Sequence, residues 1–263
     1  MRWYNPNSSA STDEENPYWM SFSDMMASLL VIFMLAAAAL MLQLVIKTED
    51  LEKKSQKVDK QVDEVARAEK VRKQIIDEIV DELKQKQIVV EKSDNDTVLH
   101  IPESSLRFAS GSSDIPESLQ ANVREIGNVL YEALNRDIES QNKEKRARFT
   151  LLDTVFIEGH TDNNFYKNPM LRGNWGLSAM RAISVWQFWA DDPNQVSNGL
   201  SQMINHANEA LFSVSGYGDT RPRDDAKHCE KNDDICHSKN RRIDIRITVK
   251  KPSIKDLEEI KGK

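Results

Sequence analysis

The sequence predicts an α+β protein with a single N-terminal transmembrane helix, a helical linker and a β/α sandwich domain. Three observations predict this class: an apolar run that ends at Ile46, a charged stretch without glycine or proline over residues 47–86, and alternating strand and helix patterns from residue 87 onward. The formal net charge of −6 gives no basic excess for nucleic acid. We therefore expect no nucleic-acid partner.

The apolar run from Met25 to Ile46 is long enough to cross a bilayer. Its 22 residues include only Ser28 and Gln43 as strongly polar side chains, and they form about 33 Å of helix. A buried core helix is rarely so uniformly apolar. A cleavable signal peptide is the stronger alternative, with small residues at 36–39, but acidic residues precede the run and it continues past them. We predict an uncleaved span over residues 18–46 after a polar tail at 1–17.

Residues 47–86 predict a helical linker. Leu51, Val58 and Val65 are seven residues apart, and four further apolar positions then follow helical spacing: Val71, Ile75, Ile79 and Leu83. This thin seam fits helix pairing in a homodimer, and it equally fits a solvated spacer. Both interpretations stay open from the sequence.

Residues 87–250 predict the sandwich domain, before a short charged tail at 251–263. Two strands surround the turn at 94–96, a helix runs from Pro116 to about Leu134, and a buried strand ends in "FIEGH". A helix over "NWGLSAMRAISVWQFWADD", a shorter helix near 200–210 and two strands, "ALFSVSGYGDTRP" and "RRIDIRITV", complete the order β-β-α-β-α-(α)-β-β.

Charged side chains gather where the buried strand ends and the next helix begins. "FIEGHTDN" presents Asp162 beyond the strand, and Asn174, Ser178, Arg181 and Val185 share one face of the helix. An aspartate accepts hydrogen bonds from an ammonium group, and an arginine binds a carboxylate with two parallel bonds. The pair can therefore hold a zwitterionic amino-acid end.

The blocks "IEGHTDN…NWGLSAMRAISV…GYGDTRP…NRRIDIRI" resemble the OmpA-type peptidoglycan-binding domain over about Val89 to Val249. The resemblance implies that Asp162 holds the amine of diaminopimelate in the peptide stem and that Arg181 holds its carboxylate. It also implies supporting roles for Asn174, Leu177, Asn240, Arg241 and Arg242. The loop after Asp162 contains Phe165, Tyr166 and Arg172 and is longer than in outer-membrane members of the family.

No catalytic constellation accompanies this motif. His160 has no nucleophile beside it in the sequence pattern, so we interpret it as structural and expect no enzyme activity and no cofactor.

Cys229 and Cys236 lie in "KHCEKNDDICHSKN", each beside a histidine. Four potential ligands permit a zinc site, although adjacent residues rarely both bind one tetrahedral ion. A peptidoglycan-binding domain faces the oxidising periplasm, so the resemblance favours a disulfide between the two cysteines. Free thiols remain the third alternative.

Two indications of membrane orientation disagree. Lys47, Lys53, Lys54 and Lys57 follow the span, and by the positive-inside rule they favour a cytoplasmic C-terminal side. Large domains translocate regardless of flanking charge. The wall-binding resemblance therefore decides the expectation: a single-pass protein of the bacterial inner membrane with a cytoplasmic N-terminus and a periplasmic domain.

Asp24 is a carboxylate close to the apolar run. Ser21, Asp24 and Ser28 form a polar stripe on one helix face. One interpretation is a helix cap, because Ser21-x-x-Asp24 resembles a capping box; the other is an ion-carrying acid.

The segment "NPYWMSFSDMMASLLVIFMLA" is similar to that of motor stator B subunits in the MotB family, in which Trp19, Asp24 and Met26 match in order. This resemblance implies a homodimer inside a ring of A subunits (MotA-like or ZorA-like) and transport of H⁺ or Na⁺ past Asp24, with Ser21 and Ser28 beside it.

Within that family, the acidic tail, the cysteine loop and "FSDMMASLL" look closer to ZorB, the B-type subunit of the Zorya anti-phage systems, than to flagellar MotB. A passive envelope tether, in which Asp24 only caps a helix, is the alternative from a different class.

Overall fold

The computed structural model describes residues 17–93, 95–139, 145–164, 173–191 and 196–251, and its architecture is the predicted α+β class. The expected tail at 1–17 and the expected tail at 251–263 lie almost entirely outside the described residues. The chain divides into two compact units, Met1–Asp59 and Lys60–Lys263. Each unit is treated by itself below.

In the N-terminal unit, helix α1 (Pro17–Gln85) begins before the apolar run and continues through it. No glycine or proline interrupts the helix after Pro17, which suits the first helical position. The helix is long and apolar enough to cross a membrane. Large apolar side chains are exposed all round it between Tyr18 and Ile46, as expected for a helix that faces lipid or other helices.

The part of α1 that belongs to the C-terminal unit is a core element. Ala68, Val71, Ile75, Ile79 and Leu83 are at most 5% exposed and join the main hydrophobic cluster of that unit. The C-terminal unit therefore begins within the linker predicted for residues 47–86, and the second half of that segment belongs to the domain. Of the predicted seam, Leu51 and Val58 are exposed, whereas the residues from Val71 onward pack into the domain.

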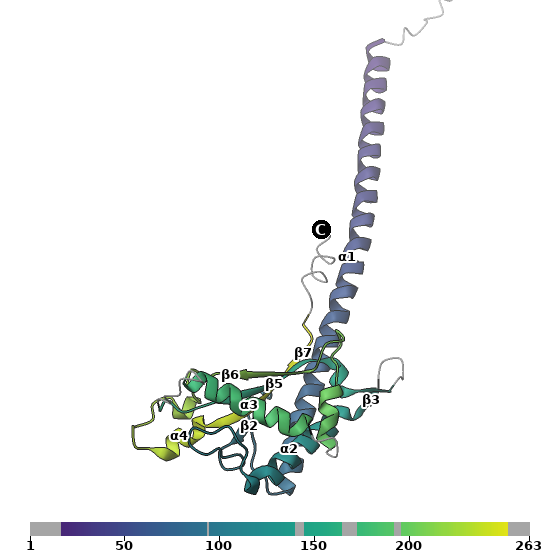
Figure 1. The fold of residues 1–263 in the computed structure, drawn as a ribbon. Helices are drawn as coiled ribbons and strands as arrows, with labels where there is room; N and C mark the ends of the chain where they lie inside the picture. Colours follow the sequence, from purple (N-terminus) through teal and green to yellow (C-terminus); the bar gives the residue numbers. More distant parts are fainter. Residues whose placement is uncertain (1–16, 94, 140–144, 165–172, 192–195, 252–263) are drawn as a thin grey trace, which may run out of the picture. The chain divides into compact units, whose positions relative to one another are not determined.

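A five-stranded sheet forms the centre of the C-terminal unit (Figure 1), in the order β1-β2-β7-β5-β6. Its members are β1 (Glu91–Lys92), β2 (Val98–Pro102), β5 (Leu152–His160), β6 (Phe212–Gly216) and β7 (Arg242–Val249). β5 and β6 are parallel, and the other pairs are antiparallel. β5 and β7 lie in the middle of the sheet, which explains why both are largely buried.

Helix α3 (Asn174–Ala190) packs against β5 and β6, and helix α2 (Glu117–Asn135) packs beside α3. The two helices meet where the Trp189 indole donates a hydrogen bond to the Val123 carbonyl at 2.7 Å. α3 lies very close to β5, because a Cβ atom at Gly159 would be 1.9 Å from the Ser178 carbonyl oxygen. This close approach brings the first turns of α3 next to the end of β5, where the site motif lies.

The structure also differs from the predicted element order. A small hairpin of β3 (Asp137–Glu139) and β4 (Lys145–Ala147) follows α2, and 3-10 helix η1 (Arg148–Leu151) precedes β5. The helix expected near 200–210 is instead the 3-10 helix η2 (Val196–Gln202), followed by turns. The loop before the last strand holds 3-10 helix η3 (Asp224–Ala226) and helix α4 (Asp234–Asn240), which have too few apolar residues to show a periodic pattern.

Candidate functional site

The first candidate site lies on α1 in the N-terminal unit. Asp24 is exposed, and within the part of the chain that the structure describes its carboxylate has no hydrogen bond or ion pair. The Ser28 hydroxyl donates instead to the backbone carbonyl of Asp24 at 2.8 Å. Ser21 and Ser28 therefore share a face with Asp24 without a hydrogen bond to its carboxylate.

The capping interpretation of Asp24 does not fit this helix. An N-cap residue has a non-helical backbone and lies at the boundary of the helix. Ser21 lies within α1, which begins at Pro17, and the first turn has no acidic residue. Ser21 and Asp24 consequently do not form a capping box.

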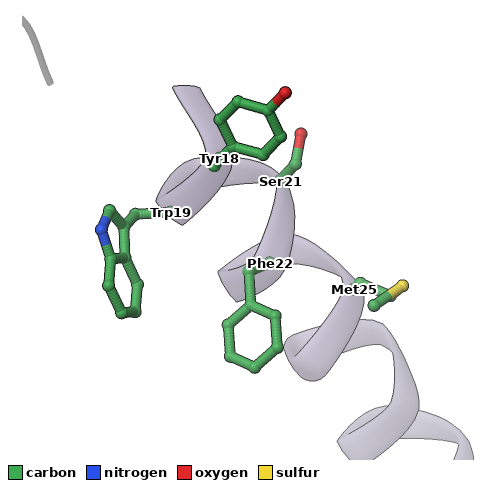
Figure 2. A pocket seen from close by; sticks show the side chains of 5 residues that line it. All are labelled: Tyr18, Trp19, Ser21, Phe22 and Met25. Atoms are coloured by element: carbon green, nitrogen blue, oxygen red, sulfur yellow. The ribbon is translucent and has the colours of Figure 1, made fainter. Parts of the chain in front are cut away.

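A shallow hollow of about 490 Å³ lies on the first turns of α1, where Tyr18, Trp19, Ser21, Phe22 and Met25 project from the helix (Figure 2). The Trp19 and Phe22 rings meet edge to face, with centroids 6.4 Å apart. Aromatic side chains of this kind suit a membrane interface or a neighbouring helix. The hollow is thus lined mainly by apolar side chains.

The second candidate site is a pocket of about 380 Å³ in the C-terminal unit, called here the mixed-charge pocket. Loop 103–111, residues 161–164 and the start of α3 form its walls, together with Asp234 at the start of α4 and Arg241 directly after α4. Its charged lining is balanced, with three acidic and three basic side chains: Glu103, Asp162, Asp234, Arg107, Arg181 and Arg241. A pocket with separated charges of both signs suits a zwitterionic group.

Asp162 follows β5 and is held by Arg241. One terminal nitrogen of Arg241 (Nη1) donates to Asp162 Oδ2 at 2.7 Å, and the other (Nη2) donates to Glu103 and to Asp234 at 2.7 and 2.8 Å. Burial opposes the charged form of Arg241, but these three carboxylates raise its pKa further above its usual value. Arg241 therefore stays charged and fixes the acidic side of the pocket.

Arg181 comes from the third turn of α3 and is only 6% exposed. Its guanidinium donates from Nε to the Ser112 carbonyl at 3.0 Å and from Nη2 to the Ala109 carbonyl at 3.2 Å. It also lies 5.0 Å from the centroid of the Phe108 ring, a cation–π distance. These contacts orient the predicted carboxylate-binding group at the pocket wall.

Asn174 and Leu177 lie at the pocket with Asp162 and Arg181. The Asn174 side chain donates to the backbone carbonyls of Asp162 and Asn164 at 3.3 and 3.1 Å, which ties the start of α3 to the segment that carries Asp162. Leu177 supplies apolar lining. Asp162, Asn174, Leu177, Arg181 and Arg241 therefore lie around one pocket, and their role in binding stays a prediction.

Two predicted residues lie elsewhere. Asn240 accepts from the Arg223 backbone and donates to the Ala226 carbonyl, so it holds the loop before β7 together. Arg242 pairs with Asp244 at 3.0 Å on the polar face of the sheet. Neither residue lines the mixed-charge pocket, although Arg242 lines a small adjoining cavity with Arg181 and Arg241. Their supporting role stays a prediction. Phe165, Tyr166 and Arg172 lie outside the described residues.

Three charged residues of the pocket were not predicted: Glu103, Arg107 and Asp234. All three come from loops or the first turn of a short helix, where local sequence spacing gives no information about tertiary neighbours. The only available signal was the density of charge in those loops.

His160 belongs to a buried polar cluster behind the pocket. Its Nε2 atom is 3.1 Å from Asp244 Oδ2, and its ring stacks on Tyr217. Burial lowers the pKa of His160, so the ring is neutral near pH 7. Although burial alone would raise the pKa of Asp244, contacts with His100 and His160 and the charge of Arg242 hold it well below its usual range.

Glu158, His160 and Asp244 are close enough together to be considered as metal ligands. Both carboxylates, however, are already bound by guanidinium groups: Glu158 by Arg246 at 2.8 Å and Asp244 by Arg242. These cations oppose a metal ion at the same place. The cluster is consistent with a structural role for His160.

Cys229 and Cys236 form a disulfide, with Cα atoms 5.4 Å apart. His237 is buried, and its Nε2 atom lies 3.0 Å from the Glu230 carbonyl. The arrangement differs from a four-ligand zinc site, in which both sulfurs would bind the ion.

The chain is similar to proteins of the OmpA family and to a motility protein. Residues 107–235 match the model of the OmpA family. Motility protein B of Bacillus subtilis is 28% identical over 156 residues, which are 59% of this chain and 47% of that protein. The chain spans about half the length of the curated relatives it matches.

Among solved structures, the cell wall anchor of the T6SS from Pseudomonas aeruginosa aligns with a TM-score of 0.43 and 20% identity, over 68% of this chain and 99% of that chain. The periplasmic domain of Helicobacter pylori MotB aligns with a TM-score of 0.40 and 17% identity, over 66% and 88% of the two chains.

Proposed function

We propose, from the premise that this chain is a MotB-like protein with an OmpA-type domain, that it is the B-type stator subunit of an ion-driven motor in the bacterial inner membrane. Its C-terminal unit anchors the motor to peptidoglycan. The observation that carries the proposal is the mixed-charge pocket, which unites Asp162 with Arg181 in one cavity. Helix α1, long enough to span a bilayer, supplies the membrane part.

In this proposal the pocket binds the diaminopimelate of a peptide stem. Asp162, fixed by Arg241, accepts from the ammonium group of the ligand. Arg181, oriented by the loop carbonyls of Ala109 and Ser112, binds the ligand carboxylate. Leu177 contacts the aliphatic part of the ligand between the two charged ends.

Asp24 carries the transported ion, H⁺ or Na⁺, in the N-terminal unit. An acid without a partner on an apolar helix is costly in a membrane unless it faces a pathway or another subunit. We place a second copy of this chain and a ring of MotA-like or ZorA-like subunits around α1. The N-terminus is then cytoplasmic and the wall-binding unit is periplasmic.

The finer assignment is to anti-phage defence, as a ZorB-like subunit. It rests on the resemblance of "FSDMMASLL" and of the cysteine loop, together with an acidic N-terminal tail. A flagellar stator subunit is the second candidate, favoured by the match to motility protein B. Deletion of the gene distinguishes the two: loss of phage resistance supports the first, and loss of swimming supports the second.

Wall anchoring is tested by co-sedimentation of the full-length, detergent-solubilised protein with purified peptidoglycan sacculi. Asp162→Asn and Arg181→Ala should each weaken binding by about tenfold or more, because each removes a charged contact with the ligand. Arg124→Ala is the matched control, since Arg124 lies on α2 beside Phe188 and does not line the pocket. Unchanged binding of both pocket variants would mean that the pocket is not the wall-binding site.

A further inference from the structure

The disulfide-closed segment (residues 229–236) contributes a wall of the mixed-charge pocket. The Cys229–Cys236 bond closes a short loop that contains Asp234, the first residue of α4. Asp234 lines the pocket together with Asp162 and Arg181, although it is far from them in the sequence. The cysteine loop is therefore connected to the candidate binding site.

Several contacts hold Asp234 in this position. The Asp233 side chain caps α4 by accepting from the Cys236 backbone at 3.0 Å, and the His237 ring lies 3.0 Å from the Glu230 carbonyl. Arg241 Nη2 donates to Asp234 Oδ1 at 2.8 Å. One end of the segment is thus fixed by the sulfur bridge and the cap, and the carboxylate is fixed by Arg241.

Arg241 places the carboxylates of Asp234 and Asp162 at neighbouring positions on one guanidinium group. Their accessibility differs, because the Asp234 side chain is 74% exposed and the Asp162 side chain is 12% exposed. Arg241 lowers the pKa of Asp234, so its carboxylate is charged at neutral pH. The pocket therefore has an inner acid and an outer acid on the same side.

We propose that Asp234 is a second ligand-binding carboxylate at the mouth of the pocket and that the disulfide is its positioning device. The ligand class is a peptide whose primary ammonium group lies between Asp162 and Asp234. Glu103 also binds Arg241, so three carboxylates share the positive charge of Arg241 and net negative charge remains for the ammonium group, unlike at Glu158 and Asp244, where each carboxylate has its own guanidinium. This inference rests on the proposed wall-binding function and adds a residue that determines specificity for the amine. If the disulfide positions Asp234, reduction of the disulfide weakens binding of the ligand.

The experiment measures sacculus co-sedimentation of the full-length protein in detergent, with free meso-diaminopimelate as the soluble competitor. Asp234→Asn should weaken sacculus binding about three- to tenfold and should raise the competitor concentration needed for half displacement, because an exposed charged contact is partly screened. Asp224→Asn is the matched control: Asp224 is also an exposed aspartate, and it pairs with Lys227 outside the pocket.

The role of the disulfide is tested by a double-mutant cycle. Cys229→Ser/Cys236→Ser should weaken binding in the wild-type background and have little further effect in the Asp234→Asn background, because contacts that act through one group are not additive. A reducing agent should weaken binding by the wild type and leave the serine variant unchanged. Thermal unfolding followed by circular dichroism verifies that each variant is folded.

Three outcomes overturn the inference: unchanged binding by Asp234→Asn, additive losses in the cycle, or an equal loss in Asp224→Asn. Failure of the proposed function gives a different result, because the wild-type protein itself would then not bind sacculi.

Discussion

Each of the two units of this chain carries an aspartate for which we propose a function, and the two residues have opposite surroundings. Asp162 is 8% exposed and is bound by Arg241 within its own unit. Asp24 is exposed, and no described side chain of its own chain makes a hydrogen bond or ion pair with its carboxylate. The C-terminal unit thus contains acidic and basic side chains that face one pocket, whereas Asp24 has no such partner among the described residues of its helix.

This difference indicates which chains supply the groups around each aspartate. The pocket is built by one chain, because loops, strand ends and α3 converge on it. The apolar helix exposes large side chains all round, and such a helix has to pack against lipid and other helices. The proposed function of Asp24 therefore requires surroundings that other subunits supply.

The largest expected effect is that of Asp24→Asn. An amide cannot release a proton or bind a cation as a carboxylate does, so motor function should fall to background. Phage resistance or swimming is measured in cells, and membrane fractionation and sacculus co-sedimentation are measured in parallel. The amount of protein in the membrane fraction and its binding to sacculi should both stay at the wild-type level, because Asp24 does not line the pocket.

Asp50→Asn is the control for this experiment, since Asp50 lies on the same helix beyond the predicted span and pairs with Lys54 at 3.0 Å. Full activity of Asp24→Asn would support the passive tether and would remove the contrast between the two acids.

A second test concerns folding stability. Trp189 is fully buried between α3 and α2, and Trp189→Ala should lower the free energy of unfolding of the C-terminal unit by about 3–5 kcal/mol. Leu35→Ala, in the apolar helix, should leave that unfolding transition unchanged. Urea denaturation of the full-length protein in detergent, followed by circular dichroism, measures both. A shift caused by Leu35→Ala would show that the two units do not unfold independently.

Much of the sheet and of the pocket could be predicted from the sequence. The periodicity of "TLLDTVFIEGH" and of the segment after Asn174 predicted β5 and α3, and the resemblance predicted residues that the structure brings around one pocket. Glu103 and Asp234 could not be predicted, because their position depends on how separate loops meet at Arg241.

The boundary of the linker illustrates a different limit. Ile75, Ile79 and Leu83 follow a helical spacing that fits a dimer seam, a spacer and a domain helix equally well. Only tertiary packing shows that they are core residues. The hairpin of β3 and β4 was missed because strands of three residues are too short for a period of two to be seen.

The smallest expected effect comes from the ion pairs of α1, which differ between the two units. In the C-terminal unit, Glu78 accepts hydrogen bonds from Arg148 and from Arg136, at 2.9 Å for Arg148 Nη2 and for Arg136 Nη1. In the N-terminal unit, Glu49 pairs with Lys53 on the exposed surface. Glu78→Gln should lower the free energy of unfolding of the C-terminal unit by about 1 kcal/mol after solvent screening. Glu49→Gln should leave the unfolding midpoint of the C-terminal unit unchanged.

The pH dependence of Glu78→Gln gives the sharper test. The hydrogen bonds from Arg148, opposed by partial burial, lower the pKa of Glu78 below its usual value of 4.5. A lowered carboxyl pKa contributes stability that is fully present above pH 4.5 and is lost as the pH falls through the folded-state value. The difference in unfolding free energy between wild type and Glu78→Gln should therefore be constant near neutral pH and shrink below pH 4.5. A difference that persists at low pH would show that Glu78 stabilises the unit through packing of its side chain and not through its charge.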